Sequence, residues 1–206
     1  MTESPSSPTP ANRKGAQKRA RLVAAARRTV HEHGVEQSSL AEIAEAADVP
    51  LGNVYYYFKT KDDLLRAVVE NYDGDYDRLR AVLGRHEDPR ERLKALIATW
   101  LMAKERIAMY GCPIGSLCSE LSKRDRDATS EAAGIVLGKL VTVAEEQFAA
   151  LGSVDPHGNA VTLVAAYEGA ALLSHALHDP QILVDHAARL TRWVDSLDDP
   201  ALDPRG

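Results

Sequence analysis

Residues 38–65, SSLAEIAEAADVPLGNVYYYFKTKDDLL, determine how the N-terminal part of the chain folds. Ser39 with Glu42 three residues later is the reciprocal capping box of a helix start. Apolar residues then recur at helical spacing, at Leu40, Ile43, Ala44 and Ala47. Asp48 tolerates a left-handed backbone, and proline suits the first position of a helix. The stretch therefore predicts two short helices joined by a tight turn.

The second of these helices divides its aromatic residues between two faces. At about 100° per residue, four positions share one arc and are expected to face the core: Leu51, Val54, Tyr55 and Phe58. The opposite arc holds Gly52, Asn53, Tyr56 and Tyr57. Exposed aromatic rings beside a glycine cost stability, so this outward face is expected to approach a partner closely. This geometry matches the helix-turn-helix, whose second helix enters the major groove of DNA.

Charge is unevenly distributed along the chain. Residues 1–61 carry nine Lys/Arg against six Asp/Glu, a net charge of +3, while the remaining residues carry 16 against 24, a net charge of −8. Seven of those nine bases fall between Arg13 and Arg28, and five of the seven lie on a helix expected from Ala16 to His33 and stopped by Gly34. A basic cluster on an acidic protein is expected of a surface that contacts a polyanion, although a solvated helix face explains it equally well.

Residues 22–69, which include IAEAADV, VYYYF and KTKDDLL, resemble the DNA-binding domain of the tetracycline-repressor (TetR) family of bacterial transcription regulators. The resemblance implies a dimeric, ligand-responsive regulator, most simply a repressor, that reads a near-palindromic operator. It assigns DNA contacts to Ser39, Ala41, Leu51, Gly52, Asn53, Tyr56, Tyr57 and Lys61. Leu51 stays open, because the helical wheel places it inward. Asp48 replaces a glycine usual in the family but can adopt the same backbone conformation, whereas Pro50 and Leu51 replace a family-typical Thr or Ser after the turn, which affects base preference.

The rest of the chain is helical in pattern, so the expected fold is all-α. The expected domains are a disordered tail over 1–12, a three-helix helix-turn-helix domain over 13–61, a helical effector-binding and dimerisation domain over 62–200, and a short tail over 201–206. Thr60 with Asp63 caps the first helix of the second domain. Further helices are expected over 89–110, 113–122, 128–151, 158–178 and 180–197. Apolar runs fall short of the ~20 residues of a membrane span, so a cytoplasmic protein is expected.

The last two helices are the expected dimer interface. Small residues at Ala165, Gly169 and Ala170 allow close helix approach. The last helix adds an apolar stripe of Ile182, Leu183, Ala187, Leu190, Trp193 and Val194. Family members pair through a four-helix bundle of their last two long helices. Plain packing within one chain is the alternative for these residues.

The segment GCPIGSLCSEL, residues 111–121, is similar to a motif (G-C-x-x-G-x-L-x-x-E) in a subgroup of the family, some of whose members sense electrophiles or oxidants through the cysteine. Cys112 precedes a helix start, where the partial positive charge favours thiolate. A small buried thiol that lines a ligand pocket is the competing interpretation. A disulfide with Cys118 is not expected, because the two residues lie nearly two helical turns apart.

An apolar effector pocket is expected between the C-terminal helices. Its candidate lining residues are Trp100, Tyr110, Cys112, Phe148 and Tyr167, although core packing explains each of them equally well. His175 and His178 have no evident third ligand nearby, so no metal and no cofactor are expected. The chain has no phosphate-binding glycine loop and no G-x-S-x-G, H-E-x-x-H or CxxC motif, so an enzyme is not expected. A binding or redox-sensing module that has lost its operator is the alternative function.

Overall fold

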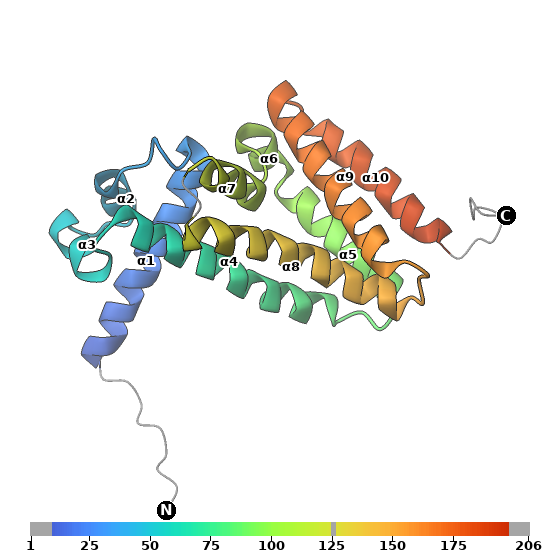
Figure 1. Ribbon diagram of the computed structural model, residues 1–206, viewed down its shortest axis with the longest axis horizontal. Coiled ribbons are helices and arrows are strands. Elements are labelled where there is room, and N and C mark those ends of the chain that lie inside the picture. Colours follow the sequence, from blue (N-terminus) through green and yellow to red (C-terminus); the bar gives the residue numbers. More distant parts are fainter. Residues whose placement is uncertain (1–9, 125–126, 198–206) are drawn as a thin grey trace, which may run out of the picture. The chain divides into compact units, whose positions relative to one another are not determined.

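The computed structural model describes residues 10–124 and 127–197, and within these ranges the chain forms ten α-helices and no strand (Figure 1). The expected all-α fold is therefore confirmed. The tails expected over 1–12 and 201–206 lie outside the described residues, except for residues 10–12, which open the first helix. The chain divides into two compact units after Asn71.

The N-terminal unit contains α1 (Pro10–His33), α2 (Leu40–Ala46), α3 (Leu51–Tyr57) and the first half of α4 (Lys61–Leu83). Its helix boundaries follow the expected local signals. Ser39 Oγ accepts a hydrogen bond from the Glu42 amide at 3.2 Å, and the Glu42 carboxylate accepts one from the Ser39 amide at 2.8 Å. Thr60 and Asp63 form the same reciprocal pair at the start of α4, with both distances 3.0 Å. Each pair satisfies amides that a helix start leaves without partners.

The turn between α2 and α3 is held by a side chain from α1. Asp48 adopts the expected left-handed backbone, with φ of 50°. The Arg21 guanidinium donates hydrogen bonds to the Ala47 carbonyl oxygen at 2.6 and 2.9 Å and also to that of Asp48. Carbonyl oxygens at a helix end lack partners within the helix and favour a cation. Arg21 therefore ties α1 to the turn that orients α3.

The inward face of α3 is narrower than the sequence indicates. Val54 and Phe58 are buried as expected, but Tyr55 is 47% exposed and Leu51 is 41% exposed. The expectation that Tyr55 is a core residue is therefore wrong. The helical wheel was centred on Leu51, whereas the buried side of this two-turn helix is centred on Val54. The helix also ends at Tyr57, and Phe58 reaches the core from an extended backbone with φ of −137°.

The C-terminal unit is a bundle of α4's second half with six further helices. These are α5 (Pro89–Met102), α6 (Lys104–Tyr110), α7 (Pro113–Ser122), α8 (Ala128–Ala150), α9 (Pro156–Leu177) and α10 (Gln181–Ser196). The single helix expected over 89–110 is in fact two, separated at Ala103, whose ψ of 8° breaks the helical path. No glycine or proline marks this break in the sequence.

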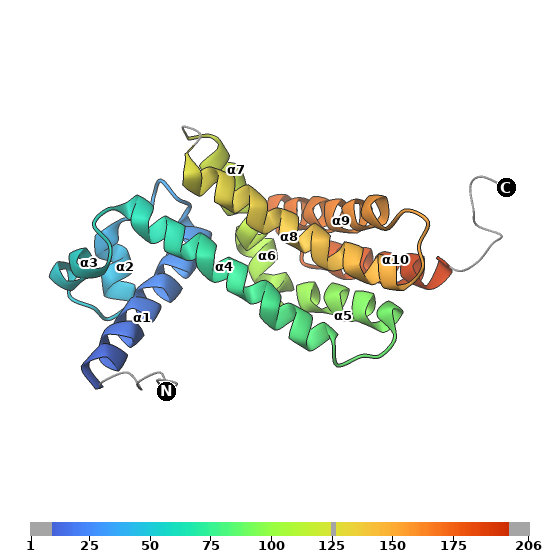
Figure 2. The same ribbon diagram turned by 60° about the horizontal axis from the view of Figure 1, so that its bottom comes forward.

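Two layers of helices enclose the core of this unit. Helix α9 packs against α8, α6 and α10, and α10 also packs against α5. Helices α4 and α8 run side by side in both ribbon views (Figures 1 and 2), joined by ion pairs between Asp73 and Lys139 and between Arg80 and Glu146. The Trp100 and Tyr167 rings stack at 4.1 Å between centroids, which ties α5 to α9.

The apolar stripe of α10 lies inside the unit. Leu183, Ala187, Leu190 and Val194 are all buried within the single chain. The alternative of packing within one chain therefore holds for these four residues. The dimer interface expected on the last two helices cannot use them.

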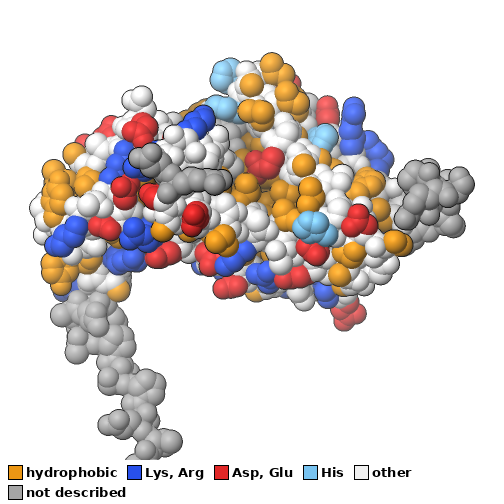
Figure 3. All heavy atoms as spheres, viewed as in Figure 1, with side chains coloured by type: hydrophobic (Ala, Val, Ile, Leu, Met, Phe, Trp, Pro, Cys, Tyr) orange, Lys and Arg blue, Asp and Glu red, His pale blue; other side chains and the backbone are white. Residues whose placement is uncertain are grey.

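The exposed apolar side chains of this region instead belong to α9. They are Val161, Leu172, Leu173 and Leu177, and the small exposed residues Ala165, Gly169 and Ala176 lie among them. At about 100° per residue, these seven positions share one side of the helix. In Figure 3, hydrophobic side chains gather over α9. We call this surface the α9 apolar face.

Helix α9 is also the one described helix whose length and composition would allow a membrane span. Uninterrupted apolar runs in the sequence are too short to predict this result, because polar residues divide the apolar stretch of α9. The core helix of a soluble bundle passes the same test, and α9 buries one side against α6, α8 and α10. The remaining apolar residues form the α9 apolar face.

We predict that Arg21→Ala loosens the α2–α3 turn. Loss of the hydrogen bonds to Ala47 and Asp48 should lower the local free energy of opening by about 1–2 kcal/mol, since hydrogen bonds from a charged donor contribute this much and Arg21 is partly exposed. Hydrogen–deuterium exchange of peptides covering α2 and α3 measures this opening. Lys18→Ala, an exposed change on the same helix, is the matched control. Equal exchange in the two variants would contradict the assignment.

Candidate nucleic-acid interface and ligand cavity

The outer face of α3 is an exposed surface of small, polar and aromatic side chains. Leu51, Gly52 and Asn53 are exposed, and a Cβ on Gly52 would meet no other atom. Tyr56 is 78% exposed, so its outward direction is as predicted. The face offers the Asn53 amide and the Tyr56 hydroxyl group for hydrogen bonding, and the space beside Gly52 is open.

Tyr57 and Lys61 are half-buried rather than fully outward. The Tyr57 ring meets that of Tyr56 edge to face, with centroids 5.0 Å apart, and its hydroxyl lies close to Gly15 of α1. Lys61 is the first residue of α4, and its Nζ donates a hydrogen bond to the Glu36 carbonyl oxygen at 3.4 Å. Ser39 and Ala41, the two positions assigned on α2, are exposed. The residues assigned to DNA contact are therefore all exposed or half-buried at the surface of the N-terminal unit.

The basic residues of α1 serve two purposes. Arg21 holds the α2–α3 turn, and the Arg19 guanidinium lies 5.2 Å from the centre of the Phe58 ring, a cation–π distance. Lys14 and Lys18 are exposed. The basic cluster is therefore partly structural, and its exposed members, which include Arg28, are distributed along α1.

A cavity of about 530 Å³ lies in the C-terminal unit between the start of α7 and the middle of α9. Its lining residues are Gly111, Cys112, Gly115, Ser116, Ser119, Glu120, Glu168, Gly169, Leu172 and His175. Much of the 111–120 motif therefore gathers at this cavity. The volume is sufficient for a small organic ligand.

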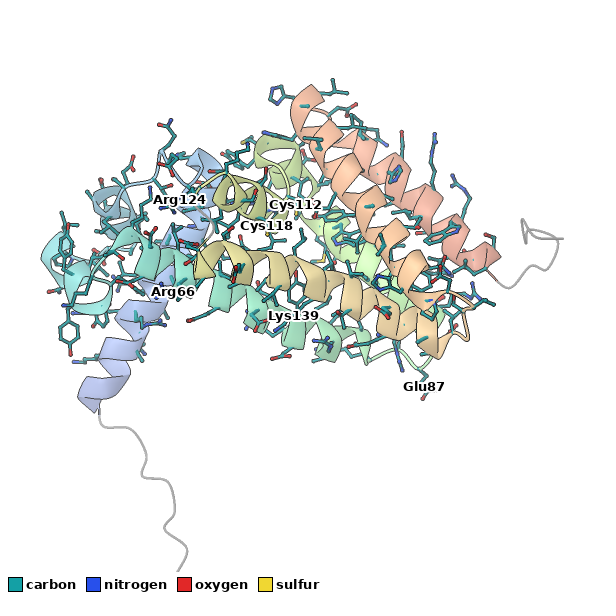
Figure 4. The ribbon with its side chains drawn as sticks, in the orientation of Figure 1. Arg66, Glu87, Cys112, Cys118, Arg124 and Lys139 are labelled. Atoms are coloured by element: carbon teal, nitrogen blue, oxygen red, sulfur yellow. The ribbon has the colours of Figure 1, made fainter. Side chains whose placement is uncertain are left out.

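Cys112 is the N-cap of α7 at the wall of this cavity (Figure 4). Its Sγ accepts a hydrogen bond from the Gly115 amide at 3.4 Å and lies 3.1 Å from Oε1 of Glu168. Burial, with the nearby Glu168 carboxylate, raises the pKa of the Cys112 thiol to about 12. The expectation that the helix start favours thiolate is therefore reversed, because burial and Glu168 outweigh the helix terminus.

Glu168 is a partly buried acid of this site and was not predicted as a site residue. Burial raises the pKa of its carboxyl group, while the hydrogen bond with Cys112 opposes that shift. Tyr76 of α4 is buried nearby, and burial, with the Glu168 carboxylate as a smaller cause, raises the pKa of its hydroxyl group. Tyr76 thus places α4 close to the cavity wall.

The other predicted ligand-lining residues do not line this cavity, although the Tyr167 side chain forms a hydrogen bond with Cys112 at its wall. Trp100 and Tyr167 border a second, much smaller pocket with residues of α10. Phe148 is fully buried against Trp193, and Tyr110 lies beneath the Arg106 guanidinium. Of the five candidates, Cys112 alone lines the larger cavity. Aromatic content was a poor guide, because large rings in this unit fill the core.

His175 lines the same cavity, with Nδ1 3.4 Å from the Ala108 carbonyl oxygen. Its ring meets that of His178 edge to face at 6.2 Å between centroids. Among the described residues, no group of three or more His, Cys, Asp or Glu side chains is placed to hold a metal ion. The histidine pair therefore contributes hydrogen-bonding groups.

Comparison with known proteins gives the same assignment for the N-terminal unit. Residues 22–68 match the family model described as bacterial regulatory proteins, tetR family. The HTH-type transcriptional regulator TtgR of Pseudomonas putida is 36% identical over 59 residues, which cover 29% of this chain and 28% of that protein. The match thus spans about a quarter of the length of this curated relative.

Solved structures extend the likeness over most of the chain. Regulatory protein TetR from Rhodobacter sphaeroides has a TM-score of 0.71 at 27% identity, covering 84% of this chain and 96% of that one. A TetR-family transcriptional regulator from Streptomyces coelicolor has a TM-score of 0.75 at 21% identity, covering 89% and 97%. The N-terminal unit is therefore similar to the tetR family of bacterial regulatory proteins, and most of the chain shares the fold of these two solved regulators.

Proposed function

We propose that this protein is a cytoplasmic repressor, not an enzyme, which holds a near-palindromic operator as a homodimer and releases it when a small molecule binds. The observation that carries the proposal is the exposed outer face of α3 in a unit that matches the bacterial regulatory family. Asn53 and the Tyr56 ring would meet base edges or thymine methyl groups. Tyr57 and Lys61 would contact phosphates.

The remaining assigned residues would support this docking. Leu51 and Gly52 at the start of α3 would enter the groove, since Leu51 is 41% exposed and Gly52 allows close approach. Ser39 and Ala41 would lie along the sugar–phosphate backbone. Lys14 and Lys18 would add phosphate contacts whose strength falls with salt.

The α9 apolar face is our candidate for the dimer interface. It runs along a helix whose opposite side is buried, and Leu172 is 66% exposed in the single chain. A second copy would bury this row, and Ala165, Gly169 and Ala176 would allow the two helices to approach closely. Two-fold symmetry would then place two α3 helices about one DNA turn, ~34 Å, apart.

Ligand release would operate through α4. Tyr76 of α4 is buried near Cys112 and Glu168 of the cavity wall, and α4 continues from Tyr76 back to Lys61, which follows α3 in the chain. A ligand that favours one position of α4 would change the spacing of the two α3 helices. A difference in affinity of a few kcal/mol between the two states suffices to empty the operator.

We predict that Tyr56→Ala weakens binding to DNA flanking the protein's own gene by about tenfold or more, since each subunit loses a contact with the groove. The double variant Tyr56→Ala/Lys61→Ala should abolish the shift. Mobility shift across a salt series measures both effects, with Arg85→Ala, an exposed change in the C-terminal unit, as the control. Wild-type strength binding by the double variant, or no discrimination among fragments by the wild type, would contradict operator recognition.

We predict that Leu173→Glu yields a monomer at micromolar concentration. The new charge would be buried without a partner at the α9 apolar face, a cost that an interface formed by one α9 helix from each subunit cannot absorb. Analytical ultracentrifugation gives the mass. Ile135→Glu, which changes an equally exposed apolar residue on α8, should leave the dimer intact. A dimeric Leu173→Glu variant would place the interface elsewhere.

The burial of Cys112 disfavours the alternative of a redox-sensing module. In a Cys118→Ser background, we predict that Cys112 in the folded protein reacts with a disulfide reagent at pH 7.5 at least about tenfold more slowly than in denaturant. A pKa raised to about 12 leaves little thiolate at this pH. Glu168→Gln should speed the reaction by removing a nearby negative charge. A folded-state rate equal to the denatured rate would restore the sensing interpretation.

A further inference from the structure

The side chains that line the 530 Å³ cavity determine which charge a ligand must carry to bind there. Its ten lining residues include two carboxylic acids, Glu120 and Glu168, and no lysine or arginine. Ser116 and Ser119 add hydroxyl groups. The wall presents the Glu168 carboxylate to a ligand with no lysine or arginine among the lining residues, and this favours positive charge on the ligand at that point.

Gly115 has no side chain, and the Glu168 carboxylate occupies the space that a side chain there would need. A Cβ on Gly115 would collide with Oε2 of Glu168, while Oε1 lies 3.1 Å from the Cys112 thiol. The carboxylate therefore lies against the first turn of α7. A helix start attracts anions, and here the chain supplies that anion itself. Glu168 therefore occupies the position at the start of α7 that an anionic ligand would otherwise take.

The remaining wall adds hydrogen-bond acceptors and an apolar edge. Nδ1 of His175 faces the Ala108 carbonyl oxygen, and the neutral tautomer that donates this hydrogen bond leaves Nε2 as an acceptor. Leu172 and Gly169 of α9 form the apolar edge of the cavity. A ligand that complements the wall carries hydrogen-bond donors or positive charge at one end and hydrocarbon at the other.

We propose that this cavity binds a small organic cation, an amine, amidine or quaternary ammonium, with its charged group at Glu168 and its hydrocarbon part against Leu172. This inference rests on the proposed function, since it names the chemical class of the effector. Burial already disfavours the ionised form of Glu168, and a bound cation would relieve that cost. A carboxylate or phosphate ligand would meet two negative groups at close range.

The experiment is isothermal titration calorimetry of the full chain with matched aromatic probes. Benzyltrimethylammonium, benzamidine and phenethylamine represent cations, phenylacetate an anion, and benzyl alcohol a neutral compound. We expect at least one cation to bind, and phenylacetate and benzyl alcohol to bind more weakly or not at all. Glu168→Gln should weaken cation binding at least about tenfold and leave benzyl alcohol unaffected, since it removes the charge and keeps the shape.

Two further variants keep the test decisive. Glu131→Gln, an exposed acid on α8 outside the cavity, should leave cation affinity unchanged. Glu120→Gln removes the other carboxylate of the wall and should also weaken cation binding, which covers the case in which Glu168→Gln does not fold. Unchanged cation affinity in the folded Glu168→Gln or Glu120→Gln protein, preference for phenylacetate, or no cation binding would overturn the proposal.

Calorimetry requires no DNA, so the outcome is independent of operator binding. A protein that binds cations through Glu168 and reads no operator would refute the proposed function alone. A protein that binds its operator and accepts no cation would refute this inference alone.

Discussion

The Arg21 guanidinium holds the turn on which the α3 surface depends. A two-turn helix such as α2 gains little from its own hydrogen bonds, and its last carbonyl groups have no partners within the helix. Arg21 reaches them from α1 and spans the left-handed Asp48. The direction of α3, and therefore the exposure of Asn53 and Tyr56, follows from this link. The same contact withdraws one base from the cluster available to DNA.

A comparable constraint organises the C-terminal unit around Glu168. Each of the three named residues in the Gly-Cys-x-x-Gly segment has a structural role. Gly111 adopts φ of 82°, Cys112 caps α7, and Gly115 leaves room for the carboxylate. The motif therefore shapes a cavity wall, and it does so while keeping the thiol protonated. The resemblance to cysteine-sensing relatives thus concerns the shape of this wall, because the chemistry of Cys112 is set by its buried neighbours.

Local signals in the sequence were sufficient wherever local physics decides the structure. The capping pairs at Ser39 and Thr60, the left-handed Asp48 and the bounds of α7 were all predicted, because each involves residues within a few positions of one another. The exposure of Tyr55, the break at Ala103 and the pKa of Cys112 were not. Each depends on packing or charge from distant segments, as with Glu168, which is 56 positions from Cys112.

The α10 stripe of the expected interface was misassigned for a related reason, and the α9 apolar face links the two proposals. Periodicity identifies an apolar stripe but not what covers it, and the α10 stripe is covered by the chain itself. The exposed stripe is on α9, where Gly169 and Leu172 belong both to the α9 apolar face and to the cavity edge. A second copy docked on that face would therefore border the cavity. Ligand occupancy and subunit packing would then act on the same two residues, so that a ligand could change the dimer geometry directly as well as through Tyr76 and α4.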